Sequence, residues 1–356
     1  MNHTITSDKL SVPNQPAAWG PVFAVALGTF VLVASEFMPV SLLTPIALDL
    51  GITEGQAGLS IGISGAFALF TSLFIARLAG SLDRKLLLLG LTLLMILSGS
   101  LAAFAPSYFW FMAGRALIGV AIGGFWAMSA ATAMRLVPIH KVPLALAIVN
   151  GGNALATVVA PPLGSYLGGI VGWRGAFLCL VPVAAIALVW KLVSLPPMPA
   201  AQGQAPANVL NLLKRPPVAL GMAAVSLFFM GQFALFTYLR PFLEQVTGVN
   251  VSTLSMILLV IGLAGFAGTT LIGRLLHQHL YRTLIGIPVV MALIAVALIA
   301  FGRVLPVTAV LRGIWGLVGT AAPVAWWTWV AKTLPKDAVG GETLGSVQAD
   351  RTSKNN

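Results

Sequence analysis

The sequence predicts an all-α membrane protein built from two homologous helical halves. Hydrophobic residues make up 58% of the 356-residue chain and charged residues only 8%, whereas a soluble domain carries about 25% charged residues. The apolar residues fall in runs long enough to cross a bilayer as helices, which takes about 20 residues each. A pattern in the first half of the chain returns in the second, and this favours a duplicated architecture.

The duplication appears as an ungapped repeat with an offset of 197 residues, the separation of Arg115 and Arg312. The shift lays Gly65, Arg77, Leu78, Lys85, Arg115, Gly119, Arg135 and Pro138 on Gly262, Arg274, Leu275, Arg282, Arg312, Gly316, Lys332 and Pro335. A register kept over so long a stretch indicates two homologous halves rather than chance matches.

Six spans are predicted in the first half, residues 19–194, after a polar cytoplasmic tail at 1–18. They cover about residues 19–43, 57–79, 86–105, 108–134, 144–170 and 172–193. The residues between the first two spans, from Thr44 to Gln56, are predicted to form a polar loop.

A Pro-, Ala- and Gln-rich stretch at 195–217 is predicted to be a cytoplasmic linker. Four further spans are expected in the C-terminal half, residues 218–333, and a polar tail occupies 334–356. These spans cover about residues 218–240, 253–273, 284–302 and 305–331. The total is therefore about ten spans.

Loop charge predicts that both termini are cytoplasmic, because cations collect on the inner side of a membrane. With the N-terminus inside, the inner loops hold Arg77, Arg84, Lys85, Arg135, Lys141, Lys191, Lys214, Arg215, Arg274, Arg282, Lys332 and Lys336. The outer loops then hold Arg174, Arg240 and Arg303 together with the acids Asp49, Glu54 and Glu244. The net charge of +11 is spread over these loops, so the expected partner is the lipid bilayer and not a nucleic acid.

Glu36 and Arg115 are ionisable residues inside predicted spans, where such residues are costly and usually functional. Both lie roughly 10–12 Å from the outer end of their helices at 1.5 Å per residue, so we expect them to pair. A buried carboxylate beside an arginine can bind and release a proton, since burial favours its neutral form and the cation its charged form. The alternative is a static ion pair. Arg312 has no obvious acid nearby, and an interfacial or backbone-bonded role is expected for it.

Several motifs together resemble the major facilitator superfamily, in its drug:proton antiporter branch. They are the basic turn GSLDRK, Arg115 followed four residues later by Gly119, the Gly172-Trp173-Arg174 triplet and the stretch NALATVVAPPLGS. The turn departs from the family pattern, with Ala79 where a glycine is usual. The resemblance implies a twelve-helix fold, and we therefore expect this chain to be a truncated form of a twelve-span parent.

The resemblance also implies a gate at the basic turn, formed by Asp83, Arg84 and Lys85, and an interface between halves at Pro161 and Gly164. The alternative for the turn is a simple charge anchor, and for the small residues a role in helix packing alone.

Within this branch the likeness is greatest to exporters of purine ribonucleosides, over stretches such as EFMPVSLLTPIALDLGITEG and GQFALFTYLRP. It implies antiport of inosine- or guanosine-type nucleosides and purine analogues against protons, in a bacterial inner membrane. Aromatic and amide side chains suit a purine ribonucleoside, and the candidates for its cavity are Phe125, Trp126, Ser129, Asn150, Asn153, Gln232, Phe236 and Tyr238. Aromatic residues of membrane proteins often face lipid instead.

No catalytic or metal-binding pattern is recognised, so neither an enzyme nor a cofactor nor a metal is expected. A phosphate-binding glycine loop with its lysine is also missing from the sequence, which argues against an ATP-driven pump. We expect a monomer driven by an ion gradient. The alternatives are a facilitator or importer on the same fold, an exporter of another drug, sugar or small molecule, and a fragment that does not transport.

Overall fold

A computed structural model describes residues 18–80, 82–199 and 214–333. The chain divides into two compact units, the first containing Met1–Ala160 and Leu167–Pro206 and the second Pro161–Tyr166 and Ala207–Asn356. The C-terminal tail, most of the N-terminal tail and most of the predicted linker lie outside the described residues.

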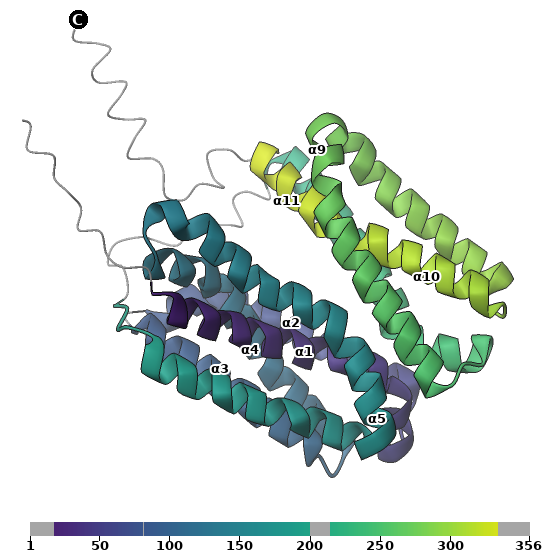
Figure 1. Ribbon diagram of the computed structural model, residues 1–356, viewed down its shortest axis with the longest axis horizontal. Helices are drawn as coiled ribbons and strands as arrows, with labels where there is room; N and C mark the ends of the chain where they lie inside the picture. Colours follow the sequence, from purple (N-terminus) through teal and green to yellow (C-terminus); the bar gives the residue numbers. More distant parts are fainter. Residues whose placement is uncertain (1–17, 81, 200–213, 334–356) are drawn as a thin grey trace, which may run out of the picture. The chain divides into compact units, whose positions relative to one another are not determined.

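The first unit is a bundle of long helices (Figure 1). In order these are α1 (Trp19–Leu50), α2 (Glu54–Ala79), α3 (Arg84–Ala103), α4 (Tyr108–Leu136), the 3₁₀ turn η1 (Ile139–Lys141) and α5 (Val142–Ser194), except for Pro161–Tyr166 of α5, which belongs to the second unit. Helix α4 contacts α1, α2 and α3. Many large apolar side chains remain exposed on the outside of the unit, as expected for helices whose outer faces meet lipid.

The first helix is longer than predicted. Helix α1 continues through the predicted loop to Leu50 and ends at Gly51, whose φ of 62° is readily available only to glycine. The next helix starts almost at once with a capping box between Thr53 and Gln56. The prediction of a polar loop from Thr44 was therefore wrong, because Asp49 is accommodated in the last turn of α1.

Helix α5 contains two of the predicted spans. It is interrupted at Gly172, whose φ of 73° and ψ of 166° are not helical. Among the described residues, nine helical stretches are long and apolar enough to cross a membrane, and α5 is counted as one of them. With α5 divided at Gly172, these stretches accommodate the ten predicted spans.

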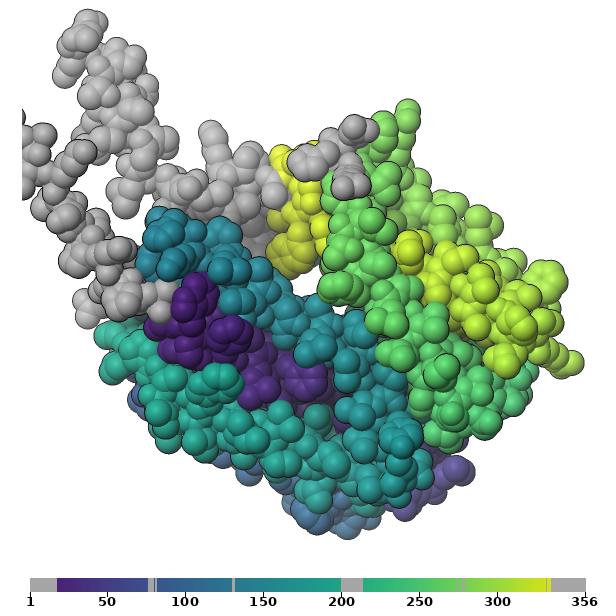
Figure 2. Space-filling view, in the orientation of Figure 1, coloured from purple at the N-terminus to yellow at the C-terminus, as the bar shows by residue number. Residues whose placement is uncertain are grey.

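The second unit contains α7 (Pro216–Thr237), α8 (Leu239–Phe242), the π-helical turn η2 (Leu243–Thr247), α9 (Val251–Phe301), α10 (Leu305–Gly319) and α11 (Ala322–Thr333). Helix α9 bends at His279, where φ is −138°, and so supplies two spans. It packs against α10 and α11, and Figure 2 shows the atoms of α9 and α10 in close contact.

The internal repeat is also present in the packing of each unit. A Cβ placed on Gly119 would clash with the carbonyl oxygen of Ser64, and a Cβ on Gly316 would clash with that of Ile261. These two pairs are related by the offset that the sequence repeat predicts. Helix α4 thus approaches α2 in the same way as α10 approaches α9, and both contacts require glycine because the backbones nearly touch.

This packing makes a first prediction. Gly119→Ala should destabilise the folded protein by about 1 to 3 kcal/mol, since the added methyl forces α2 and α4 apart. The matched control is Gly65→Ala on α2, where a Cβ meets nothing within 4 Å. Thermal unfolding of the two purified variants in detergent measures the difference. Equal melting temperatures would show that the α2–α4 contact is not a close-packing constraint.

Candidate functional site

The candidate site is centred on Arg115 of α4, whose guanidinium is enclosed by α1, α2 and α4. The residue is 1% exposed. Nη1 donates a hydrogen bond to the carbonyl oxygen of Ser35 at 2.8 Å, and Nε donates to that of Ser60 at 3.2 Å. Nη2 donates to Oε2 of Glu36 at 3.0 Å. These acceptors offset the cost of a cation within a membrane helix.

Glu36 of α1 receives hydrogen bonds from two other helices. Besides the bond from Arg115, its Oε1 accepts a bond from Ser64 Oγ of α2 at 3.0 Å. The Glu36 side chain is 18% exposed, against 1% for that of Arg115. The structure therefore places in direct contact the two residues that the sequence predicted to pair, with the carboxylate as the more accessible partner.

Ser64 has two alternative acceptors for its single hydroxyl hydrogen. Its Oγ lies 3.0 Å from Glu36 Oε1 and 2.8 Å from the carbonyl oxygen of Ile61. It also lies 3.3 Å from Arg115 Nη2 and can accept a bond from it. Ser64 can consequently donate to a charged Glu36, or turn toward Ile61 when Glu36 carries a proton.

The second unit keeps the arginine but replaces its polar partners. At the repeat positions of Glu36, Ser60 and Ser64 stand Phe233, Ile257 and Ile261. Arg312 is 2% exposed, and within the described residues its Nε has no hydrogen-bond partner. Its guanidinium lies 5.0 Å from the centre of the Phe242 ring. The structure therefore buries Arg312 instead of leaving it at an exposed interface, and the alternative of a backbone-bonded role remains a prediction.

The cavity candidates of the first unit lie in different environments. Phe125 is fully buried in the apolar core, and Ser129 is buried as well. Trp126 and Asn150 are exposed, and Asn153 is half-buried. Phe125 is thus a core residue in this conformation and not part of a cavity wall, because helix packing covers its entire side chain.

The candidates of the second unit lie on or next to α7. Gln232 Nε2 donates to the carbonyl oxygen of Gly319 at 3.3 Å, while its Oε1 is buried without a partner among the described residues. Phe236 is half-buried, and Tyr238 is exposed at the end of the helix. Gln232 is therefore the candidate of this unit with a buried acceptor that has no partner among the described residues.

The basic turn acts within the first unit. Asp83 Oδ1 accepts from the backbone nitrogen of Lys85 at 2.7 Å and caps α3, while Oδ2 accepts from the backbone nitrogen of Met198 at 2.8 Å. The backbone nitrogen of Arg84 donates to the carbonyl of Met198 at 3.0 Å. Asp83 thus ties the segment after α5 to the start of α3. The gating role of the three residues remains a prediction.

The small residues of α5 are enclosed. Pro161, Gly164 and Ser165 are all buried, and the Ser165 hydroxyl has no hydrogen-bond partner among the described residues. Both alternatives, a role in helix packing and a place at the interface between halves, remain predictions.

A polar cluster at the end of α1 was not predicted. Asp49 Oδ2 accepts from Trp173 Nε1 at 3.1 Å and from Arg174 Nη2 at 2.8 Å. Arg174 Nη1 also donates to the carbonyl oxygen of Ala105 at 2.6 Å. From the sequence, Asp49 and Arg174 were expected to be separate charges in the outer loops. The kink at Gly172 brings the two residues together.

Lys191 is a further residue whose surroundings the sequence did not predict. It was counted among the inner loop cations, but the structure buries it completely inside the first unit. Its Nζ donates to Thr92 Oγ1 at 2.9 Å and lies 5.0 Å from the centre of the Phe125 ring. A lysine three residues before the end of an apolar helix usually extends toward the interface, so no sequence signal identified its burial.

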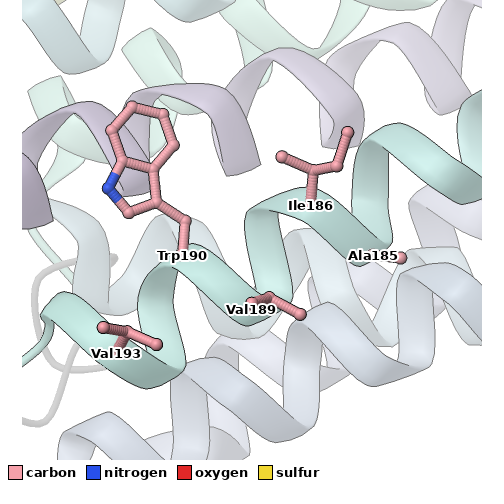
Figure 3. A pocket seen from close by; sticks show the side chains of 5 residues that line it. All are labelled: Ala185, Ile186, Val189, Trp190 and Val193. Atoms are coloured by element: carbon pink, nitrogen blue, oxygen red, sulfur yellow. The ribbon is translucent and has the colours of Figure 1, made fainter.

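The surface of α5 carries an open apolar hollow of about 430 Å³. Figure 3 shows its five lining side chains along the last turns of the helix: Ala185, Ile186, Val189, Trp190 and Val193. Apart from the indole nitrogen of Trp190 the lining is hydrocarbon, and it suits lipid chains better than the hydroxyls of a ribose.

Helices of membrane-spanning length, a duplicated architecture and an ion pair enclosed between helices define the class of polytopic secondary transporters. A sequence model described as the Major Facilitator Superfamily matches residues 25–347. The chain belongs to this superfamily, and the predicted family and helical fold are confirmed.

Comparisons with individual proteins give relatives of two kinds. The transcription regulatory protein OpdE of Pseudomonas aeruginosa is 59% identical, covering 96% of this chain and 89% of OpdE. The purine ribonucleoside efflux pump NepI of Salmonella paratyphi B is 42% identical, covering 96% of this chain and 84% of NepI. Among solved structures, a variant of the nucleoside transporter NupG superposes with a TM-score of 0.70 over 88% of this chain and 82% of its own. At 15% identity this last likeness shows the fold alone.

Proposed function

We propose that this protein is a proton-coupled antiporter of a bacterial inner membrane that exports purine ribonucleosides, of the inosine and guanosine type, and purine analogues. The observation that carries the coupling is the enclosed carboxylate of Glu36 beside Arg115. The substrate class is supported by relatives that are 41% to 42% identical over 96% of the chain and are named purine ribonucleoside efflux pumps.

The bonds around Arg115 suit a carboxylate that changes its charge. When Glu36 takes up a proton, Arg115 still donates to the carbonyls of Ser35 and Ser60. Ser64 then turns its hydrogen to the carbonyl of Ile61 and accepts from Arg115. Arg115 and Ser64 thus keep acceptors for their hydrogens, so the neutral state of Glu36 costs less than it would if the carboxylate were their sole acceptor. Glu36 is the proton-binding residue in this proposal.

The direction of export follows from the proposed orientation. Loop charge places both termini in the cytoplasm, and this assignment does not need Lys191, which is buried in the first unit. In this proposal protons enter from the outside and bind Glu36, and the nucleoside leaves in exchange.

The test is uptake of radiolabelled inosine into inverted membrane vesicles, which corresponds to export from the cell. We expect uptake that collapses when an uncoupler dissipates the proton gradient, and competition by guanosine but not by a sugar such as xylose. Vesicles without the protein provide the control. Uncoupler-resistant uptake would indicate a facilitator, and competition by unrelated drugs or sugars would indicate a different exporter.

A second candidate function is a regulatory one, favoured by the name of the 59% identical relative. In this case the membrane protein would change gene expression when its ligand is present. Transcript profiles of a deletion strain complemented with an export-defective variant separate the two functions. Full restoration of the wild-type profile by that variant would show a regulatory role that does not depend on export.

A further inference from the structure

Two arginines lie together at one end of the first unit, the end that loop charge assigns to the cytoplasmic side. Arg84 is the first residue of α3, and Arg135 lies in the last turn of α4. The backbone nitrogen of Arg84 donates to the carbonyl oxygen of Met198 at 3.0 Å. Nη1 of Arg135 donates to the carbonyl oxygen of the next residue, Pro199, at 2.9 Å. The segment after α5 therefore holds both arginines through two adjacent carbonyls.

The positive charges of Arg84 and Arg135 repel each other. Within the described residues neither arginine forms an ion pair. The acid next to them, Asp83, is used by the backbone. Its Oδ1 accepts from the nitrogen of Lys85 at 2.7 Å, and its Oδ2 accepts from that of Met198 at 2.8 Å. Two like charges therefore lie close together, and the acid beside them is bound to other groups.

The other acids in the described part of the first unit are also held elsewhere. Glu36 is bound to Arg115, and Asp49 is bound to Arg174. Glu54 lies in the first turn of α2, at the opposite end of that helix from the basic turn. The described acids of this unit therefore leave the two arginines without a counter-ion.

The position of the two arginines suits the headgroup of a lipid. Helix α3 begins at Arg84, and α4 ends one residue after Arg135, so both lie where membrane-spanning helices reach the phosphate level of a bilayer. The apolar hollow of α5 is at the same end of the unit. Its last lining residue, Val193 (Figure 3), precedes Met198 by five residues, so their Cα atoms are at most about 18 Å apart. One lipid can therefore reach both the arginines and the hollow.

We propose that Arg84 and Arg135 bind the phosphate group of an anionic phospholipid of the inner leaflet, with an acyl chain in the hollow of α5. A guanidinium group donates parallel hydrogen bonds to phosphate oxygens, and a shared anion offsets the repulsion between the two cations. Arg135 gives one donor to Pro199, which orients the guanidinium and leaves its remaining N–H groups for the ligand. A zwitterionic lipid suits the site less, because its cationic headgroup adds another positive charge.

The test measures melting temperature and lipid binding of the purified protein in detergent. Arg84 contacts Met198 through its backbone only, so Arg84→Gln keeps that hydrogen bond. Without added lipid this variant should melt at the temperature of the wild type or slightly above it, because a repulsion is removed. Added phosphatidylglycerol should raise the melting temperature of the wild type by several degrees and that of the variant clearly less. The dissociation constant for phosphatidylglycerol should rise about tenfold in Arg84→Gln and in Arg135→Gln.

The matched control is Lys141→Gln, which removes a cation from the same end of the unit, where Lys141 lies 5.9 Å from the centre of the Trp19 ring. We expect it to bind phosphatidylglycerol nearly as the wild type does. An equal loss in this control would show general attraction to an anionic surface and overturn the site. Equal stabilisation by phosphatidylcholine or by inorganic phosphate would overturn the anionic lipid as its ligand. A lower melting temperature of Arg84→Gln without lipid, with the full lipid effect retained, would show a structural cation. These readouts need no transport, so their failure leaves the proposed function untouched.

Discussion

Replacing Glu36 by glutamine should abolish export driven by the proton gradient while the protein still folds. Glutamine has nearly the same size, its amide oxygen can accept from Arg115, and its amide nitrogen can donate to the hydroxyl of Ser64. It cannot bind and release a proton, and loss of a proton-transfer group typically costs a factor of about 100 or more in rate. Uncoupler-sensitive uptake of inosine by inverted vesicles measures the loss.

Exchange of labelled for unlabelled inosine across the same vesicles should survive in Glu36→Gln, since exchange needs substrate binding but no net proton movement. Glu54→Gln is the matched control, because Glu54 is a half-buried acid at the start of α2 that accepts a bond from Thr44. Normal pH-dependent export by Glu36→Gln would remove Glu36 from the coupling mechanism.

Arg115→Ala should have the largest effect on folding. It leaves the Glu36 carboxylate with Ser64 as its remaining side-chain donor, and it strips the carbonyls of Ser35 and Ser60 of a hydrogen bond. Removing one partner of a buried ion pair costs about 3 to 5 kcal/mol. We expect little protein in the membrane and a strongly lowered melting temperature for what can be purified.

The double variant Glu36→Gln with Arg115→Ala should recover part of the lost stability. The glutamine is neutral, so no charge is left buried without its partner. Arg303→Ala is the control, since Arg303 is exposed and a surface substitution changes stability by about 0.5 kcal/mol or less. A melting temperature of Arg115→Ala equal to that of the wild type would contradict the enclosed position of this cation.

The helical fold could be predicted from the sequence because a bilayer leaves few alternatives. A run of about 20 apolar residues has to form a helix, since lipid offers no partner for free backbone groups. The repeat was equally visible, and the contacts of Gly119 with Ser64 and of Gly316 with Ile261 occur at equivalent positions. The polar loop after the first span was misplaced, because the helix end depends on the left-handed backbone of Gly51.

The contact between Glu36 and Arg115 could also be predicted from the sequence. Each is costly in a membrane on its own, and the predicted span ends gave them a similar depth, so the sequence favoured a pair. Helix α1 is longer than predicted, but the two side chains still meet. The sequence alone could not predict that the carbonyl oxygens of Ser35 and Ser60 accept hydrogen bonds from Arg115. Nor could it predict that the hydroxyl of Ser64 can donate to either of two acceptors. These groups come from three helices, and only their packing brings them around one guanidinium.

The sequence by itself thus determined the membrane class, the duplicated helices and the residues of the charged pair, because each follows from the cost of polar groups in lipid. The tertiary structure alone decided which charges are enclosed. Lys191 and Arg312 resemble boundary and interface residues in the sequence, and Phe125 resembles a ligand-binding aromatic residue. All three are buried because neighbouring helices close over them, and burial of a side chain depends on the helices packed against it rather than on its position along its own helix.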